Sequence, residues 1–404
     1  YRGAGRPEAT LALERIIDVY AAEIGMDPAE LRRRNFLGKD DFPYVTQTGA
    51  DMDTGDYEAA LDKVLEIVDV DALRAEQAAR IDDPTRPLLG IGWAAYVEIT
   101  NPLSASEFGS CEIRPDGTAL LLTGSSAHGQ GHYTTFAQLA SELTGIPVDK
   151  IEVRHGDTDE VKRGGGTGGS RSLQVGGTAI WEATKTVVEQ AKEVAADVLE
   201  ANPADIILDT SAGTFAVTGS PSVAIGWAEV AAQAADANQP LAAENDFQPP
   251  AATFPFGVHL SVVDVDRDTG EVRLVRHAAC DDAGIIVNPT IVDGQVHGGV
   301  AGGVGQALME EFVYDEWGNP QTGNFMDYAI PAASEFPSFD RIAMETPTDR
   351  NPLGVKGIGE AGTIGSTPAV QNAVVDALKH LGVRHVDIPV TPMRVWRAIH
   401  EAGQ

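Results

Sequence analysis

The sequence predicts an α+β fold in two parts, and two patterns support this prediction. Residues 9–24 and 57–80 carry helical periodicity and are joined by polar, turn-rich sequence. After residue 86 the pattern changes to apolar strands followed by glycine-rich loops that lead into helices. The polar stretch 82–87 contains two prolines and separates these patterns, so we expect domains at 1–85 and 86–404.

The first part is expected to be helical. In residues 9–24, the apolar positions that recur at helical spacing and fall near one stripe of an amphipathic helix are Leu13, Ile16, Ile17, Tyr20 and Ile24. Gly25 is suited to end this helix, and Asp27 followed by Pro28 is typical of the N-cap and first position of a short helix that reaches residue 34. Residues 57–80 are expected to form one further helix.

The second part is expected to alternate between strands and helices. In chain order we expect a strand at 118–123, a helix at 134–143, a strand at 151–155, a helix at 172–199, a helix at 226–236, a hairpin at 258–276, a helix at 293–311 and a helix at 367–381. The last of these helices is predicted to begin at Thr367 and Pro368, as N-cap and first position. The segment 203–256 is poorly patterned apart from its one helix.

Composition excludes several classes of protein. The chain has 404 residues, with 29 basic and 60 acidic side chains and a net charge of −31, which disfavours binding to nucleic acid or to anionic membranes. Cys111 and Cys280 are the only cysteines, so a disulfide framework and a four-cysteine iron–sulfur cluster are both excluded. We see no basic leader and no apolar run of membrane-spanning length, and we therefore expect a cytoplasmic protein without an integral membrane segment.

Four glycine-rich stretches are the strongest candidates for a ligand site: residues 128–132, 162–172, 293–306 and 354–362. Glycine allows the backbone to approach a ligand closely, and a helix N-terminus offers unpaired N–H donors. Gln130 can donate to and accept from a polar cofactor edge, while the lysine, arginines and serines of the second stretch favour phosphate. Glu360 is a candidate general base whose pKa burial would raise. The alternatives are turns and close helix packing for the glycines, and a surface position for Glu360.

Two familiar motifs are rejected. The G-x-G-x-x-G matches at 164–169 and 357–362 do not follow directly on an apolar strand, so a dinucleotide-binding fingerprint is not supported. His128 and His132 have the spacing of zinc ligands, but the glutamate that should follow the first histidine is absent.

Five segments, in the same order as in known proteins, resemble the molybdenum-hydroxylase family. They are residues 1–9 (YRGAGRPEA), 129–134 (GQGHYT), 168–172 (GGSRS), 293–308 and 355–362 (VKGIGEAG). This family comprises the large, molybdopterin-binding subunits of xanthine dehydrogenase, aldehyde oxidase and carbon monoxide dehydrogenase. The likeness extends over the C-terminal half of such a subunit, so residues 1–85 would complete a first cofactor-binding domain and 86–404 would form a second.

The resemblance implies a molybdenum-dependent hydroxylase that oxidises an aldehyde or N-heterocycle with water as the oxygen source and Glu360 as the general base. The cofactor would be molybdopterin, in its cytosine dinucleotide form, and its dithiolene would hold the molybdenum without protein metal ligands. The residues implied to contact it are Arg2, Gly3, Gly129, Gln130, Gly131, Ser170, Arg171, Ser172, Gln295 and Lys356.

Departures from the family define the alternatives. Gly3 stands where carbon monoxide dehydrogenases proper have a copper-binding cysteine, and Ala4 where xanthine enzymes have an aromatic residue. A form II carbon monoxide dehydrogenase-like subunit with an unknown small substrate, or a non-catalytic fragment without cofactor, are the competing readings. Under the family reading, the electrons require an iron–sulfur small subunit and a flavin (FAD) medium subunit, and the N-terminal half comes from a separate chain or an untruncated gene.

Overall fold

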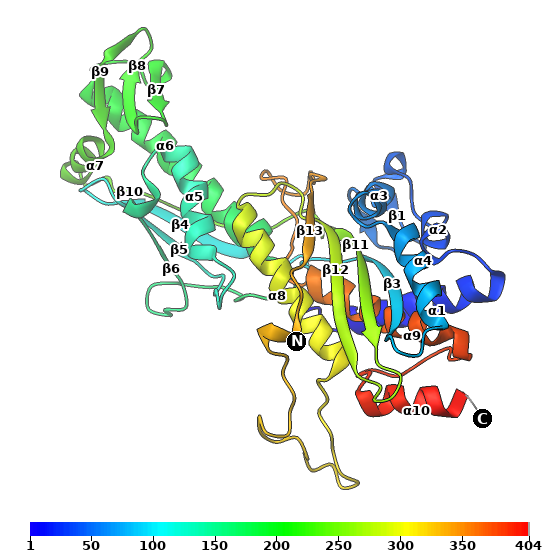
Figure 1. The fold of residues 1–404 in the computed structure, drawn as a ribbon. Helices are drawn as coiled ribbons and strands as arrows, with labels where there is room; N and C mark the ends of the chain where they lie inside the picture. The colour runs from blue at the N-terminus through cyan, green and yellow to red at the C-terminus, as the bar shows by residue number, and fades with distance from the viewer. Residues whose placement is uncertain (403–404) are drawn as a thin grey trace. The chain divides into compact units, whose positions relative to one another are not determined.

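The computed structural model describes residues 1–402 and has the predicted mixture of helices and strands, arranged in two compact units (Figure 1). Unit 1 comprises Tyr1–Ile99, Phe254–Pro347 and Ile358–Gln404, and unit 2 comprises Thr100–Thr253 and Thr348–Gly357. The predicted boundary at 85/86 concerns cofactor-binding domains of a complete subunit and stays a prediction.

Unit 1 is built around a four-stranded sheet with the order β13-β12-β11-β3. Strand β11 is antiparallel to both of its neighbours, whereas β13 runs parallel to β12. The strands are β3 (Leu88–Val97), β11 (Phe256–Val265), β12 (Val272–Asp282) and β13 (Asp340–Met344), and a short separate pair is formed by β1 (Tyr44–Val45) and β2 (Asp51–Met52). Every described residue of β11 is buried, which places this strand in the core.

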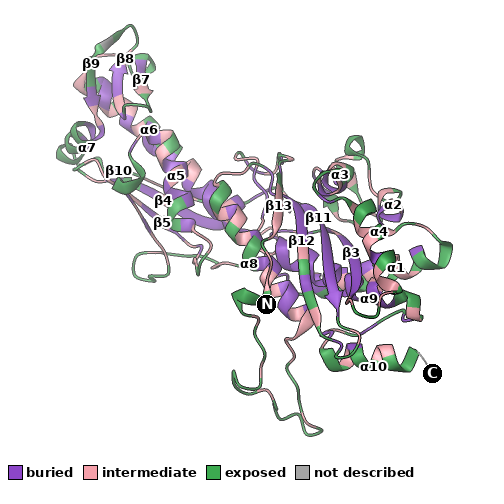
Figure 2. Ribbon diagram, viewed as in Figure 1, coloured by how far each residue is buried: buried purple, intermediate pink, exposed green. Residues whose placement is uncertain are grey.

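The helices of unit 1 are α1 (Arg6–Ile24), α2 (Pro28–Arg33), α3 (Tyr57–Ile67), α4 (Val70–Ile81), α8 (Pro289–Leu308), α9 (Ala361–Leu378) and α10 (Pro392–Ala402). Helix α9 is buried along almost its whole length, as Figure 2 shows. Its backbone lies close to the sheet because β3 has glycines there: a Cβ at Gly92 would lie 2.1 Å from the backbone nitrogen of Ala373. Small residues therefore hold the middle of α9, the helix that follows the candidate base, against the sheet.

Unit 2 contains a four-stranded sheet with the order β10-β4-β5-β6 and a three-stranded sheet with the order β7-β8-β9. The strands are β4 (Glu107–Ile113), β5 (Ala119–Thr123), β6 (Ile151–Arg154), β7 (Ile206–Asp209), β8 (Thr214–Val217), β9 (Ser220–Gly226) and β10 (Leu241–Phe247). The helices are α5 (His132–Thr144), α6 (Thr178–Val198) and α7 (Trp227–Asp236), and a π-helical turn at Ser172–Gly177 leads into α6. Helix α6 packs against β4 and β10.

The apolar stripe of α1 is largely exposed and is not the face that unit 1 buries. Leu13, Ile16 and Tyr20 are 63, 62 and 56 % exposed, whereas Glu14 on another side of the helix is 3 % exposed. The reason is an ion pair: the Arg32 Nε lies 2.6 Å from the Glu14 carboxylate, and both side chains are buried. Helical periodicity identified the apolar face correctly but not which face unit 1 covers.

Three other predicted elements need correction. The helix expected at 57–80 is interrupted at Asp69, whose side chain accepts from the Ala72 N–H and caps α4. The segment 203–256, which had little pattern, contains β7, β8, β9 and β10. Helix α9 begins at Ala361 rather than at residue 367, so Pro368 lies inside it. Pro368 lies among small buried residues of α9, although proline is usually found in the first turn of a helix.

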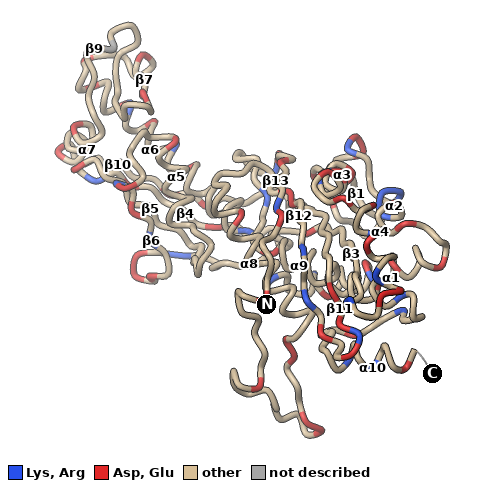
Figure 3. Tube along the Cα trace, viewed as in Figure 1, with Lys and Arg blue, Asp and Glu red and all other residues tan. Residues whose placement is uncertain are grey.

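Acidic side chains occur throughout both units, without one dominant patch along the chain (Figure 3). Within residues 1–402, no helix combines the length and the apolar character needed to cross a membrane.

Candidate functional site

Glu360 lies at the N-cap of α9, where the chain has just entered unit 1. Its side chain is 13 % exposed and forms an ion pair with the Arg6 guanidinium. The same guanidinium lies 3.4 Å from the carboxylate of Glu98, which is fully buried one residue beyond the end of β3. One arginine therefore serves two carboxylates, and the alternative of a fully exposed surface glutamate is excluded.

The pKa of Glu360 is set by opposing influences. Burial raises it, but a hydrogen bond with Glu98, the charge of Arg6 and the Gly3 N–H together outweigh burial, so the pKa lies below the ordinary value of a glutamate. The expected effect of burial is present, but Glu98, Arg6 and Gly3, which the sequence did not reveal as neighbours, reverse the net direction of the shift. Glu360 is therefore a carboxylate at neutral pH and able to accept a proton.

Arg2 connects the chain start to the segment before Glu360. Its Nε donates to the Gly359 carbonyl at 2.7 Å, and its terminal nitrogen donates to the Gln295 carbonyl of α8 at 3.0 Å. Gly3 is buried with a φ of +94°, and a Cβ there would lie 2.3 Å from the Pro7 ring. Arg2, Gly3, Gln295 and Glu360 thus come together in unit 1. Gln295 takes part through its backbone, and its side chain is half-buried rather than buried.

The loop before α5 contains Gly129, Gln130 and Gly131. Gly131 caps α5 in the left-handed conformation, with a φ of 75°, and Gly129 is exposed. The Gln130 side chain accepts from the His128 N–H at 2.7 Å, and its amide nitrogen lies 3.2 Å from the His128 ring. Gln130 therefore contacts its own loop through both ends of the amide. Burial lowers the pKa of His132 to about 4, so this histidine is neutral.

The second glycine-rich stretch, residues 162–172 (the second loop), carries less unpaired positive charge than its sequence suggests. Arg171 is buried and paired with Glu107 at 3.0 Å. Lys162 is paired with Glu244, and the Arg163 Nε donates to Asp246 at 2.8 Å. Acidic residues of β4 and β10 are thus the partners of these three side chains, and the expected phosphate contact of this stretch stays a prediction.

Two predicted serines in this loop have distinct conformations. Ser170 adopts a left-handed backbone conformation, with a φ of +52°, which is uncommon for a residue with a side chain. The Ser172 hydroxyl lies 3.0 Å from that of Thr167 across the loop. Residues in such conformations cluster at ligand sites, so Ser170 keeps its interest as a candidate.

Three loops of unit 2 converge on one another. The Gly166 N–H donates to the Gly124 carbonyl at 3.1 Å, which ties the second loop to the loop before α5. A Cβ at Gly357 would lie 2.1 Å from the Ser170 carbonyl oxygen. The backbone of the segment 348–357, which also belongs to unit 2, therefore lies against the backbone of the second loop. Lys356 on this segment is 1 % exposed.

The glycines of the stretch 293–306 serve helix packing, which was one of the two readings left open. A Cβ at Gly299 would lie 2.9 Å from the Gly362 Cα, and one at Gly303 would lie 2.1 Å from the Ser366 hydroxyl. These residues lie inside α8 rather than before it, because α8 already begins at Pro289 with Asn288 as its cap.

Sequence reasoning missed Arg6, Glu98 and Glu107. Arg6 lies inside the family-like segment 1–9, and no feature of that segment distinguished its role from that of Arg2. Glu98 and Glu107 flank apolar strand sequence, and a carboxylate next to a buried strand is the only sequence feature that could have identified them.

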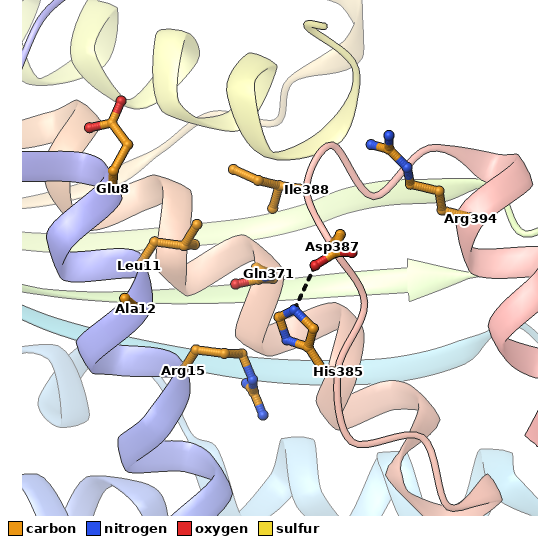
Figure 4. Close-up of a pocket in the computed structure, with 9 residues that line it drawn as sticks. All are labelled: Glu8, Leu11, Ala12, Arg15, Gln371, His385, Asp387, Ile388 and Arg394. Atoms are coloured by element: carbon orange, nitrogen blue, oxygen red, sulfur yellow. Dashed lines mark hydrogen bonds and ion pairs between the residues drawn. The ribbon is translucent and has the colours of Figure 1, made fainter. Parts of the chain in front are cut away.

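A separate cavity of 410 Å³ lies in unit 1 between α1, α9, α10 and the segment before α10 (Figure 4). It is lined by Glu8, Leu11, Ala12, Arg15, Gln371, His385, Asp387, Ile388 and Arg394, and contains none of the predicted site residues. Figure 4 shows His385 turned towards Asp387, at 3.0 Å. Within the described residues, no group of three or more histidine, cysteine or acidic side chains is arranged to hold a metal ion.

Comparison with family models gives two matches along the chain. A model described as a molybdopterin cofactor-binding domain matches residues 63–337, and a second model with the same description matches residues 1–36.

Curated relatives match nearly the whole chain. The carbon monoxide dehydrogenase large chain of Hydrogenophaga pseudoflava is 42 % identical over 98 % of this chain and 51 % of its own length. The 6-hydroxypseudooxynicotine dehydrogenase complex subunit gamma of Paenarthrobacter nicotinovorans is 36 % identical, with the same coverage. The chain therefore spans about half the length of the relatives it matches.

Solved structures also match nearly the whole chain, over about half of their own length. A Cu,Mo-CO dehydrogenase superimposes with a TM-score of 0.91 at 34 % identity, over 98 % of this chain and 52 % of the other. The quinoline 2-oxidoreductase of Pseudomonas putida 86 superimposes with a TM-score of 0.88 at 33 % identity, over 97 % and 52 %.

Proposed function

The chain belongs to the molybdopterin cofactor-binding family, and from this we propose that it forms part of the large subunit of a molybdenum-dependent hydroxylase. The proposed reaction is oxidation of an aldehyde or an N-heterocycle, with water as the oxygen source. The observation that carries the proposal is the Glu360 carboxylate, ionised and held by Arg6 at the N-terminus of α9.

The loops of unit 2 fit a large pterin ligand. Where the 124–131 and 348–357 loops meet the 162–172 loop, glycines allow close backbone contacts, so N–H and carbonyl groups rather than side chains would face a molecule bound there. The residues of unit 2 that would hold the pterin and its pyrophosphate tail, in the proposed cytosine dinucleotide form, are Gly129, Gln130, Gly131, Ser170, Arg171, Ser172 and Lys356. Since the Arg171 guanidinium is paired with Glu107, its contribution would come from its backbone.

In unit 1 the proposed cofactor contacts are Arg2, Gly3 and Gln295. Arg2 fixes the Gly359 and Gln295 carbonyls, so it holds the segment that carries the base in one conformation. When bound, the molybdenum cofactor activates water and accepts two electrons from the substrate. Because the metal supplies acidity, a carboxylate with a low pKa suffices as the base, and Glu360 would take up the proton at its side-chain oxygen.

Gly3 supports the choice of substrate class. The family's copper site needs a cysteine at this position, and the two cysteines of the chain are buried elsewhere, at 111 and 280. A side chain at position 3 would also collide with Pro7. This favours an aldehyde or N-heterocycle over carbon monoxide. Because 42 % identity links the chain to a carbon monoxide dehydrogenase large chain, a form II-like subunit with another small substrate is the second candidate.

The partners are part of the proposal. Electrons must leave the reduced cofactor, and two buried cysteines cannot build a cluster relay. We therefore expect an iron–sulfur small subunit, an FAD-containing medium subunit and the N-terminal half of the large subunit, assembled in the cytoplasm.

The test replaces the proposed base in the assembled enzyme. Glu360→Gln should lower turnover by about 10²-fold or more while molybdenum and pterin contents stay unchanged, since loss of a positioned base removes an effect of about this size. Glu66→Gln, at an exposed position, is the matched control. Full activity in a cofactor-loaded Glu360→Gln enzyme would refute the role of Glu360.

A second measurement separates enzyme from scaffold. Metal and pterin analysis of the protein purified with its partner subunits should give about one molybdenum per chain, whereas none in a well-folded complex would support the non-catalytic fragment. A screen of aldehydes, N-heterocycles and carbon monoxide then identifies the substrate class.

A further inference from the structure

Five buried polar side chains form a continuous hydrogen-bonded row inside unit 1, across strands β3, β11 and β12. In order they are Tyr96, Asp281, His259, His277 and Ser261. Successive donor–acceptor distances along the row are 2.6, 2.9, 3.1 and 2.8 Å. Each member is at most 4 % exposed. A row of this kind in the core of a sheet needs an explanation, because buried polar groups are unfavourable unless they are fully paired.

Strand register and one glycine make the row possible. Gly257 of β11 pairs with Tyr96 of β3 on one side and with Asp281 of β12 on the other. A Cβ at Gly257 would lie 2.5 Å from the Asp281 Oδ1 and 2.7 Å from the Tyr96 ring. Because Gly257 has no side chain, the Tyr96 hydroxyl reaches across β11 to the carboxylate.

The row satisfies its hydrogen bonds both with and without one extra proton, as two arrangements that differ by this proton illustrate. In the first, His259 is neutral: its Nε2–H donates to Asp281, its Nδ1 accepts from the His277 Nε2–H, and the Ser261 hydroxyl donates to the His277 Nδ1. In the second, His259 is an imidazolium that donates to Asp281 and to the His277 Nε2, and the His277 Nδ1–H donates to Ser261. No ring nitrogen is unpaired in either arrangement.

The two arrangements differ in charge. Burial would raise the pKa of Asp281, but His259 and the hydrogen bonds from His259 and Tyr96 keep it below its ordinary value, so Asp281 is ionised. Burial lowers the pKa of His277 well below its ordinary value. We place the extra proton on His259 because its Nε2 lies 2.9 Å from the Asp281 carboxylate. The row therefore carries one negative charge without the proton and none with it. Among the described residues, the Asp281 Oδ2 has no hydrogen-bond partner, which makes the uncompensated state unfavourable.

The row lies beneath the helix that carries Glu360. Tyr96 packs against Ala361 and Ile364 in the first turn of α9. A Cβ at Gly365 would lie 2.7 Å from the His259 ring, so the helix backbone contacts the imidazole directly. Two residues beyond Tyr96, Glu98 shares Arg6 with Glu360.

We propose that this row stores one proton beneath α9 and, through its charge, sets how strongly Glu360 holds a proton. The inference rests on the proposed function of Glu360 as the base. When the row loses its proton, the new negative charge disfavours ionisation of Glu360 and makes it a stronger base; when the row regains the proton, Glu360 becomes a weaker base. The row members are positioning residues, since none contacts the reacting atoms.

The charged surroundings of His259 come from every neighbouring element. Strand β12 presents His277 and Asp281, β3 presents Tyr96, and α9 presents only Gly365 to the ring. Farther out, Glu98 and Asp282 influence the pKa of Tyr96, and Arg341 of β13 influences that of Asp281.

The direct test is neutron diffraction from crystals of the assembled enzyme at pH 5 and at pH 9. At low pH, deuterium should occupy both ring nitrogens of His259; at high pH it should occupy only Nε2, with the hydrogen bonds to His277 and Ser261 reversed. The same arrangement at both pH values would overturn the proposal.

A variant tests the consequence for the reaction. Tyr96→Phe removes the hydroxyl but keeps the ring against α9, so Asp281 loses a donor and holds the imidazolium to higher pH. The inflection in kcat against pH that reports the row should move upward by about half a pH unit or more, with cofactor content unchanged. Tyr57→Phe is the matched control, because the buried Tyr57 hydroxyl has no hydrogen-bond partner among the described residues and is outside the row. An unmoved inflection in Tyr96→Phe would contradict the proposal.

The two proposals fail separately. If a loaded Glu360→Gln enzyme stays active, the base assignment fails, while the two hydrogen arrangements can still be observed. If only one arrangement is observed, the proton store fails and the assignment of Glu360 as base is unaffected.

Discussion

Glycine and arginine serve different purposes at the β3–α9 contact and the Arg32 ion pair of unit 1 and at two surface positions of unit 2, Gly168 and Arg163. In unit 1, glycines such as Gly92 and Gly303 bring helices and strands into contact, and Arg32 is buried between the carboxylates of Glu14 and Asp18. In unit 2, Gly168 has no atom within 4 Å of where a Cβ would lie, and Arg163 pairs with Asp246 at the surface. The same residue types therefore maintain the core at some positions and lie in open loops at others, and only the structure distinguishes the two uses.

The largest expected effect is at the buried ion pair of unit 1. Arg32→Ala should lower the free energy of unfolding by about 3–5 kcal/mol, because it leaves the buried Glu14 carboxylate without its cation and removes one of the two arginines paired with Asp18. Denaturant unfolding of the variant measures this loss. Arg33→Ala, the neighbouring residue whose ion pairs are more exposed, is the control; an equal loss in both variants would show that burial of Arg32 has no special role.

The next effect is at the contact between β3 and α9. Gly92→Ala places a methyl group 2.1 Å from the Ala373 nitrogen and 2.2 Å from the Ala369 carbonyl oxygen, where backbone cannot easily move aside. Overpacking of this kind lowers the free energy of unfolding by about 3 kcal/mol. A midpoint of chemical unfolding close to that of the parent protein would mean that α9 can move away from the sheet.

A smaller effect is expected at the surface ion pair of unit 2. Arg163 and Asp246 are both nearly half exposed, so solvent screens their attraction. Arg163→Ala should leave the thermal unfolding midpoint unchanged within error, at low and at high salt. A clear loss in the variant would instead point to the Phe108 ring beneath the guanidinium, which lies 4.6 Å away.

The smallest effect on stability is expected at the open loop of unit 2. Gly168→Ala meets no neighbouring atom, so the free energy of unfolding should change by less than about 0.5 kcal/mol. If this loop approaches the pterin closely, the molybdenum content of the purified complex should still fall several-fold. Unchanged stability together with unchanged molybdenum content would remove residues 168–172 from the proposed cofactor site.

The sequence predicted the mixed fold, the hairpin of β11 and β12 and the helix that follows the loop at 128–131, because each has strong local periodicity or turn residues. It did not predict which face of α1 is covered, since the buried contact there is an ion pair between Glu14 and Arg32, which lie 18 residues apart in the sequence. Strands β7 to β10 were missed because their alternation is weak and their burial depends on α6 and α7.

For the candidate site, sequence reasoning selected Glu360, Arg2 and Gly3, which the structure brings together in unit 1. It could not identify Arg6 as the partner of Glu360, because an ion pair between residues 354 positions apart has no local pattern. For the same reason the direction of the Glu360 pKa shift was inferred wrongly: burial can be anticipated from a sequence, whereas a neighbouring cation comes from the tertiary fold.

Gly257 has a consequence for comparing related chains. Any larger residue at this position of β11 would separate Tyr96 from Asp281 and break the row into unconnected parts. A glycine that is paired on one side with a tyrosine and on the other with an aspartate is therefore a pattern that can be sought in other sequences. Relatives that keep all three residues are predicted to share the proton-dependent behaviour of this chain, and relatives with a bulky residue there are predicted to lack it.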